Sequence, residues 1–231
     1  MSEKAKQIAI LAAMFGVAVI LWDTLFIYPI KIFVVMLHEI SHGLMAELMG
    51  GDIIKIEISP GIGGVCTSTR PPGFFPTFMI ASAGYLGSLL WGSIIFLIAA
   101  HTDYDRHLSA FVGILSLIIT YYVIKSGGLF GIIFCASFSV FMLAAARYLP
   151  AIFHDYFLKF IGLTSCFYVL LDIKSDLISR TGIGSDADKI STMTGIPSIL
   201  IGFIWLLIAT VVVFYMLKNG VRANAEKSPN L

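Results

Sequence analysis

The chain alternates between long apolar segments and short polar or glycine-rich breaks. A membrane helix needs about 20 mostly apolar residues, and several of the segments approach or reach this length. The pattern predicts seven helical segments, at residues 8–25, 29–49, 78–99, 108–124, 129–148, 151–179 and 199–217. We therefore predict an all-α polytopic membrane protein with about six to seven transmembrane helices.

One stretch between the second and third segments has the period of a β-strand. Apolar and polar residues alternate at 54–58, a glycine-rich loop follows, and residues 65–69 have the composition of a second short strand. We expect a short β-hairpin directly after the second helix, and the alternative is a plain loop. Later in the chain, Ser185 stands where it can cap a short helix that runs to Thr192.

The composition supports a membrane location. Hydrophobic residues make up 58% of the 231 residues and charged residues only 13%, and the mean hydropathy is +0.93. An ordinary soluble domain is about 25% charged and 45–50% apolar. We therefore expect an integral, multi-pass protein of the lipid bilayer, located in the cell (plasma) membrane. The net charge of +1 gives no reason to expect a nucleic-acid partner.

The second apolar segment contains an unusual polar group, the pentad His38-Glu39-Ile40-Ser41-His42. Residues four apart on a helix share a face, so His38 and His42 can direct two imidazoles at one metal ion. Glu39 would lie beside them as a base for a metal-activated water. The alternative is that the two histidines only form hydrogen bonds within a helix bundle. Because polar groups in a membrane segment need partners, the sequence favours a metal site.

Catalytic zinc usually has three protein ligands and one water, so the pentad needs a third ligand from elsewhere in the chain. Few acidic residues lie near membrane depth after the pentad. Asp172 is the best candidate because it directly follows an apolar run, Asp176 is the second and Asp186 the third. The cysteines have no paired spacing, and we interpret them as buried apolar residues: Cys66, Cys135 and Cys166.

Soluble zinc proteases carry the same pentad, and two further features of this chain would serve a peptide substrate. Small residues are frequent at 81–88, and Gly84 and Gly87 would let this helix approach the pentad helix or admit a substrate backbone. Because helical carbonyls are already hydrogen-bonded, a substrate helix must unwind before it is cut. The predicted strand at 54–58 could then hold the unwound segment by strand addition.

These motifs resemble the site-2-protease-like intramembrane zinc metalloproteases, in particular the small bacterial-type branch that consists of a bare membrane domain. The resemblance rests on residues 38–46, 48–51 and 81–87 and on the acidic stretch 172–187, and it covers about residues 26–205. It implies that His38 and His42 bind zinc, and that Glu39 is the general base. It also implies that an aspartate on a later helix is the third ligand, which by position would be Asp172.

The chain departs from the better-known members of that family at two positions. They carry a glycine directly after the third-ligand aspartate, whereas Asp172 is followed by Ile173, which keeps Asp176 open as an alternative. They also have an asparagine on the glycine-rich helix, and Ser88 does not replace it.

The expected function is an intramembrane zinc metalloendopeptidase that hydrolyses peptide bonds of transmembrane proteins or peptides, with Zn²⁺ as cofactor and Glu39 as general base. We expect one membrane-embedded metalloprotease-like domain over residues 1–231, with polar tails at 1–7 and 218–231. One alternative is a non-catalytic, zinc-stabilised membrane scaffold or partner-binding protein. Another is a small transporter, but the sequence contains neither the repeats nor the paired broken helices that would support it.

Overall fold

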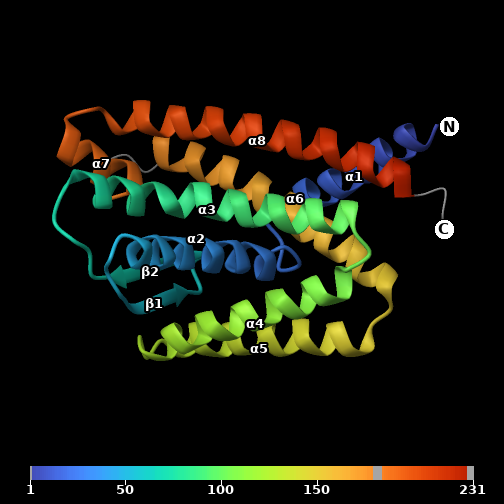
Figure 1. Ribbon diagram of the computed structural model, residues 1–231, viewed down its shortest axis with the longest axis horizontal. Coiled ribbons are helices and arrows are strands. Elements are labelled where there is room, and N and C mark those ends of the chain that lie inside the picture. Colours follow the sequence, from blue (N-terminus) through green and yellow to red (C-terminus); the bar gives the residue numbers. More distant parts are fainter. Residues whose placement is uncertain (1, 179–183, 228–231) are drawn as a thin grey trace.

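The computed structural model of the chain describes residues 2–178 and 184–227, except for the side chains of residues 176–178 and 224–227 (Figure 1). The described elements are, in order, α1 (Glu3–Ile20), α2 (Tyr28–Leu48), β1 (Ile53–Ser59), β2 (Gly63–Ser68), α3 (Phe74–His101), α4 (Asp105–Ile124), α5 (Leu129–Tyr148), α6 (Ala151–Ile178), α7 (Asp186–Thr194) and α8 (Ser198–Lys227). The prediction of an all-α fold with a hairpin after the second helix is confirmed.

Five helices of the described chain are long and apolar enough to cross a membrane, by length and composition: α3, α4, α5, α6 and α8. These helices identify the chain as an integral membrane protein. The first two apolar segments of the sequence form α1 and α2, which are not among these five.

Helix α2 lies at the centre of the molecule, between α3 on one side and the hairpin and α4 on the other (Figure 1). Its residues from Ile32 to Leu37 are at most 6% exposed. A helix that is apolar on all sides needs burial on all sides, which explains why α2 lies at the centre. After the helix ends, Gly50 adopts a φ of 87°, in the left-handed region that favours glycine. The pentad is therefore surrounded by other parts of the chain.

The hairpin packs beside α2, with β1 and β2 antiparallel. Ile56 pairs with Cys66 and Glu57 with Val65. A register shift between Ile53 and Lys55 inserts an extra residue into β1, as in a β-bulge. Strand β1 packs against α2, α4 and α5, whereas β2 packs against α2. The hairpin thus presents β2, rather than β1, toward the pocket described below.

Glycines on α3 bring this helix close to its two main neighbours. A Cβ atom at Gly87 would lie under 3.0 Å from Cβ and Oγ of Ser41 on α2. One at Gly92 would lie 2.8 Å from Cβ of Ser165 on α6. Larger residues at these positions would push the helices apart, so the small-residue stretch holds α3 against the pentad helix.

The short helix α7 packs on α3 and α8 and has a well-defined start and end. The Ser185 side chain accepts a hydrogen bond from the backbone N–H of Asp188, and the Asp188 carboxylate accepts one from the backbone N–H of Ser185. Gly195, with a φ of 72°, ends the helix. The prediction that Ser185 caps a short helix is confirmed. Helix α8 continues to Lys227, so most of the predicted C-terminal polar tail is helical.

Candidate metal centre

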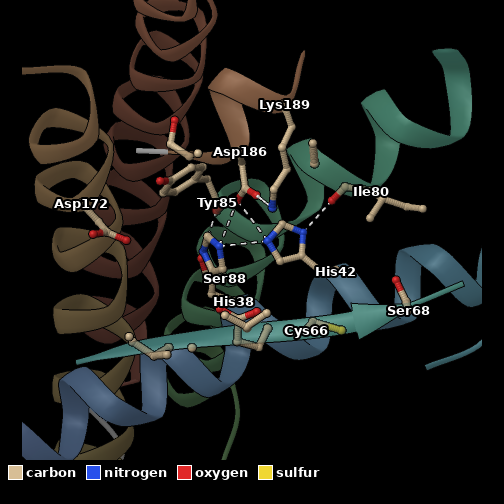
Figure 2. A pocket seen from close by; sticks show the side chains of 18 of the residues that line it. His38, His42, Cys66, Ser68, Ile80, Tyr85, Ser88, Asp172, Asp186 and Lys189 are labelled. Carbon is tan, nitrogen blue, oxygen red and sulfur yellow. Dashed lines mark hydrogen bonds and ion pairs between the residues drawn. The ribbon is translucent and has the colours of Figure 1, made fainter. Parts of the chain in front are cut away.

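Three possible metal ligands from distant parts of the chain meet beside the centre of the fold: His38 and His42 on α2 and Asp186 on α7 (Figure 2). Nε2 of His38 lies 3.0 Å from Nε2 of His42. Oδ2 of Asp186 lies 3.1 Å from the first of these atoms and 3.0 Å from the second. The three atoms therefore form a nearly equilateral triangle.

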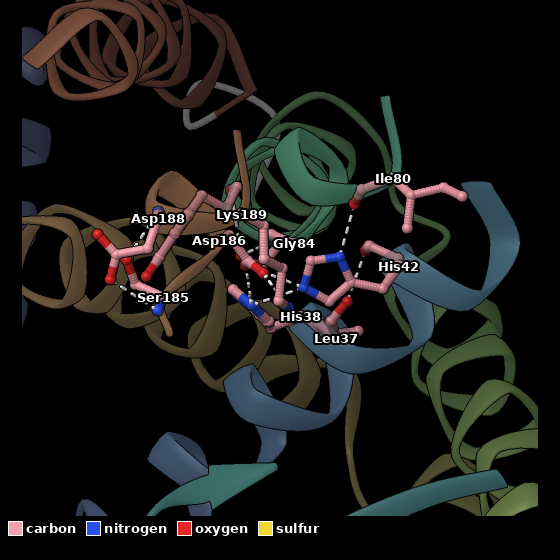
Figure 3. A network of polar contacts seen from close by, with 12 residues as sticks. Leu37, His38, His42, Ile80, Gly84, Ser185, Asp186, Asp188 and Lys189 are labelled. Atoms are coloured by element: carbon pink, nitrogen blue, oxygen red, sulfur yellow. Dashed lines mark hydrogen bonds and ion pairs between the residues drawn. The ribbon is translucent and has the colours of Figure 1, made fainter. Parts of the chain in front are cut away.

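The orientation of His42 is fixed by the backbone of α3. Its Nδ1–H donates a hydrogen bond of 2.7 Å to the carbonyl oxygen of Ile80 (Figure 3). Because a carbonyl oxygen can only accept, Nδ1 carries the proton and Nε2 presents its lone pair when the imidazole is neutral. The ring of His38 packs edge-on against Tyr85, with the centroids 4.9 Å apart. A hydrogen bond such as that of His42 to a backbone carbonyl is typical of metal-ligating histidines and fixes the orientation of the ring.

The donor set and its spacing fit a zinc ion. Tetrahedral zinc with bonds of about 2.0–2.1 Å has ligand atoms roughly 3.3 Å apart, close to the observed 3.0–3.1 Å. The Nε2 lone pair of His42 and the carboxylate of Asp186 are both acceptors that face the same point, so a proton or a cation must lie between them. Two histidines and one carboxylate are a ligand set of catalytic zinc, in which a fourth position stays open.

Gly84 on α3 leaves open space beside the two histidine ligand atoms. A Cβ atom at this position would lie under 3.0 Å from Nε2 of both His38 and His42. Any residue larger than glycine would therefore occupy the space that faces the two ligand atoms. The glycine would thus leave room for a metal ion and for a water or substrate atom bound to it.

The carboxylate of Asp186 is 6% exposed and has different partners for its two oxygens. Oδ2 faces the histidine pair, whereas Oδ1 accepts a hydrogen bond of 2.8 Å from Nζ of Lys189 (Figure 3). Burial alone would raise the pKa of Asp186, but the neighbouring His42 and His38 hold it well below its usual range. Asp186 is therefore ionised, which is the form that binds a metal.

Glu39 lines the same pocket as the three ligands and is 6% exposed. Strand β2 approaches it closely because residue 64 is a glycine. A Cβ atom at Gly64 would lie 2.7 Å from Cγ of Glu39 and 3.0 Å from its Oε1. The carboxylate thus lies between the pentad helix and the hairpin, next to His38 in sequence.

These groups open into a pocket of about 730 Å³. Its wall is formed by α2, α3, α6, α7 and β2. The wall combines apolar side chains with the polar groups of the metal centre and with hydroxyls of β2, including Thr67 and Ser68. A pocket of this size, set among membrane helices, can hold water and a stretch of peptide.

The structure brings together two of the three ligands predicted from the sequence. His38 and His42 meet as predicted, and Glu39 lies in the same pocket. Asp172 lines this pocket from α6 but is outside the group of three, and Figure 2 shows it to one side. Asp186, which the sequence ranked third, stands where Asp172 was expected. Asp176 belongs to α6, but its side chain lies outside the described residues.

The difference between Asp172 and Asp186 has a physical cause. Ranking by membrane depth favoured α6, yet the chain returns to the pocket after α6 through α7, which packs on α3. The signal that could have pointed to Asp186 is the residue before it. Ser185 is an N-cap, and an acidic residue directly after an N-cap lies at a helix N-terminus, where negative charge is favourable.

A family model described as Peptidase M50B-like matches residues 11–216, most of the chain. No significant match was found among curated proteins or among solved structures. The family match supports the resemblance to site-2-protease-like enzymes that the motifs indicate, and it covers both the pentad and Asp186. The chain belongs to the Peptidase M50B-like family.

Proposed function

We propose that this protein is an intramembrane zinc metalloendopeptidase. The observation that carries the proposal is the convergence of His38, His42 and Asp186 with the buried carboxylate of Glu39 in one pocket of a helical membrane protein. His38, His42 and Asp186 would hold the zinc ion. Asp186 replaces Asp172 in this proposal because its carboxylate lies next to both imidazoles.

A zinc ion in this position would lower the pKa of a coordinated water to about 7 and polarise the carbonyl of the peptide bond to be cut. Glu39 takes the proton from the attacking water and later donates it to the leaving amine. Its position next to the ligands in the same pocket suits this role. Its burial against β2 keeps the carboxylate from turning away into solvent.

The substrate is a membrane-protein segment that enters the pocket with its backbone unwound. Helical carbonyls are already hydrogen-bonded, so a segment must lose its helix before the peptide bond is accessible. The sequence suggested β1 as the strand that holds this segment, but β1 is covered by α4 and α5. Strand β2 lines the pocket and, in the described two-stranded sheet, has a strand partner on one edge only. We therefore assign strand addition to β2.

Glu39 distinguishes this proposal from a non-catalytic, zinc-stabilised scaffold. A purely structural site gains nothing from a buried carboxylate placed beside its ligands. A general base, by contrast, has to be in this position.

The proposal is tested by measuring zinc content and cleavage on the same purified samples. Fusion proteins that carry single transmembrane segments of varied sequence, in proteoliposomes, serve as probes of cleavage. We expect Glu39→Gln to retain zinc and to lose cleavage by about 10²–10⁴-fold. His38→Ala should lose both zinc and cleavage.

Two results would contradict the proposal. Undiminished cleavage by Glu39→Gln would remove the general base from the mechanism. A wild type that holds one zinc ion per chain but cleaves none of the fusion proteins would favour the scaffold instead.

A further inference from the structure

The two carboxylate oxygens of Asp186 face in different directions and have different partners. Oδ2 lies 3.0–3.1 Å from the Nε2 atoms of the histidine pair. Oδ1 lies 2.8 Å from Nζ of Lys189, which donates a hydrogen bond to it (Figure 2). Oδ2 thus faces the histidine pair, and Oδ1 is hydrogen-bonded to Lys189.

Lys189 reaches this oxygen because of its place on α7. It follows Asp186 by three residues, a spacing that puts both side chains on the same face of a helix. The capping box formed by Ser185 and Asp188 fixes the first turn, which contains Asp186. Lys189 also lines the pocket, so its ammonium group lies at the metal centre and not on a remote surface.

The ion pair has little value as a source of folding stability. The Lys189 side chain is 58% exposed, and an ion pair with an exposed partner contributes about 0–1 kcal/mol. The geometry of the pair matters more, because Lys189 occupies the Asp186 oxygen that does not face the histidines.

That geometry decides how a carboxylate binds a metal. A carboxylate can ligate through one oxygen or through both. If both oxygens of Asp186 were bound, the second would take a position that a catalytic zinc keeps for water or substrate. A hydrogen bond from a neighbouring side chain to one oxygen orients the carboxylate and favours ligation through the other.

We propose that Lys189 is a positioning residue that occupies Oδ1, so that Asp186 offers a metal ion only Oδ2 and the fourth coordination position stays open. The inference rests on the metal site of the proposed function. In this inference Lys189 limits the number of protein atoms that bind the metal ion, which differs from the roles of the ligands and of Glu39.

Metal affinity alone does not test this role. The ammonium of Lys189 orders the carboxylate but also repels a cation, so the two effects of its removal oppose each other. Coordination number is the discriminating quantity. Cobalt(II) replaces zinc in such sites, and its visible absorption per bound ion is stronger in four-coordinate than in five- or six-coordinate sites.

The experiment uses the full chain in detergent, stripped of metal and reloaded with cobalt(II). Bound cobalt per chain and visible absorption per bound ion are measured for the wild type, Lys189→Met and Lys189→Arg. We expect Lys189→Met to bind one cobalt ion and to lose most of the intensity of its visible bands. Lys189→Arg keeps an N–H donor and a positive charge, and it should retain the intensity.

Lys174→Met serves as a matched control, because Lys174 is exposed on α6 and does not line the pocket. It should leave the spectrum unchanged. If Lys189→Met folds poorly, Lys189→Gln tests the same point, since it keeps a donor without the charge and should hold an intermediate intensity.

The outcomes separate the inference from the function on which it rests. A wild-type spectrum in Lys189→Met would overturn the role of Lys189 while leaving the metal site intact. A wild type that takes up neither cobalt nor zinc would overturn the proposed function, and this inference with it.

Discussion

Helices α2 and α7 serve the same candidate metal centre in opposite ways. Helix α2 is enclosed by α3, the hairpin and α4, and the helix itself sets the spacing of His38 and His42. Helix α7 has nine residues, is capped by its own side chains, and carries Asp186 at its first residue. Two of the proposed ligands thus depend on local geometry, while the third depends on where a short helix packs.

The largest expected effect concerns the ligand that α7 supplies. Asp186→Ala should remove bound zinc, because it deletes the carboxylate that faces both imidazoles. Asp172→Ala should keep zinc, since Asp172 lines the pocket outside the group of three. Metal analysis of the two purified variants beside the wild type measures the difference. The reverse result would return the third ligand to α6.

A second test distinguishes two roles of the glycines on α3: one leaves space for a metal ion, and the other lets α3 pack closely against α2. Gly84→Ala should lose zinc, because its Cβ would lie under 3.0 Å from Nε2 of both His38 and His42 and would force the two imidazoles out of position. Gly87→Ala should keep zinc but lower stability by about 1–2 kcal/mol, because its Cβ meets Cβ of Ser41. Zinc content and the thermal midpoint of metal-free protein give the two readouts. Equal behaviour of the two variants would contradict this division.

The smallest expected effect concerns the cap of α7. Ser185→Ala removes the N-cap of α7, which costs about 1 kcal/mol of helix stability. Because Asp186 is the first residue of this helix, its carboxylate should be held less firmly, and zinc affinity should fall severalfold. Ser41→Ala is the matched change on α2, where the hydroxyl only donates to the Leu37 carbonyl within the helix. It should leave zinc affinity unchanged, because α2 is held by packing. Competition with a chelator measures both affinities, and equal losses would show that α2 and α7 depend alike on local hydrogen bonds.

The same contrast explains what the sequence could predict. The pentad and its helix follow from spacing within one element, as does the proposed role of Glu39, and the hairpin follows from the period of residues 54–58. The cap at Ser185 is also local, and the structure has it as predicted. Helix boundaries near Gly50 and Gly195 follow from backbone conformations that glycine favours.

The proposed third ligand, Asp186, could not be predicted in this way. Membrane depth and the family pattern both favoured Asp172, and neither contains information on how α7 packs against α3. The hydrogen bond from Lys189 to Oδ1 of Asp186 could not be predicted either, because it depends on the orientation of the carboxylate in the folded protein. The choice of β2 over β1 for the pocket depends on α4 and α5, which are distant in sequence.

The carbonyl oxygen that orients His42 belongs to the backbone of Ile80, not to its side chain. Substitution at position 80 therefore leaves the acceptor in place, although it changes a side chain that lines the pocket. The same helical turn of α3 ends at Gly84, where variation is costly. Within a single turn, position 80 thus serves His42 through its backbone carbonyl, whereas position 84 serves it through the absence of a side chain.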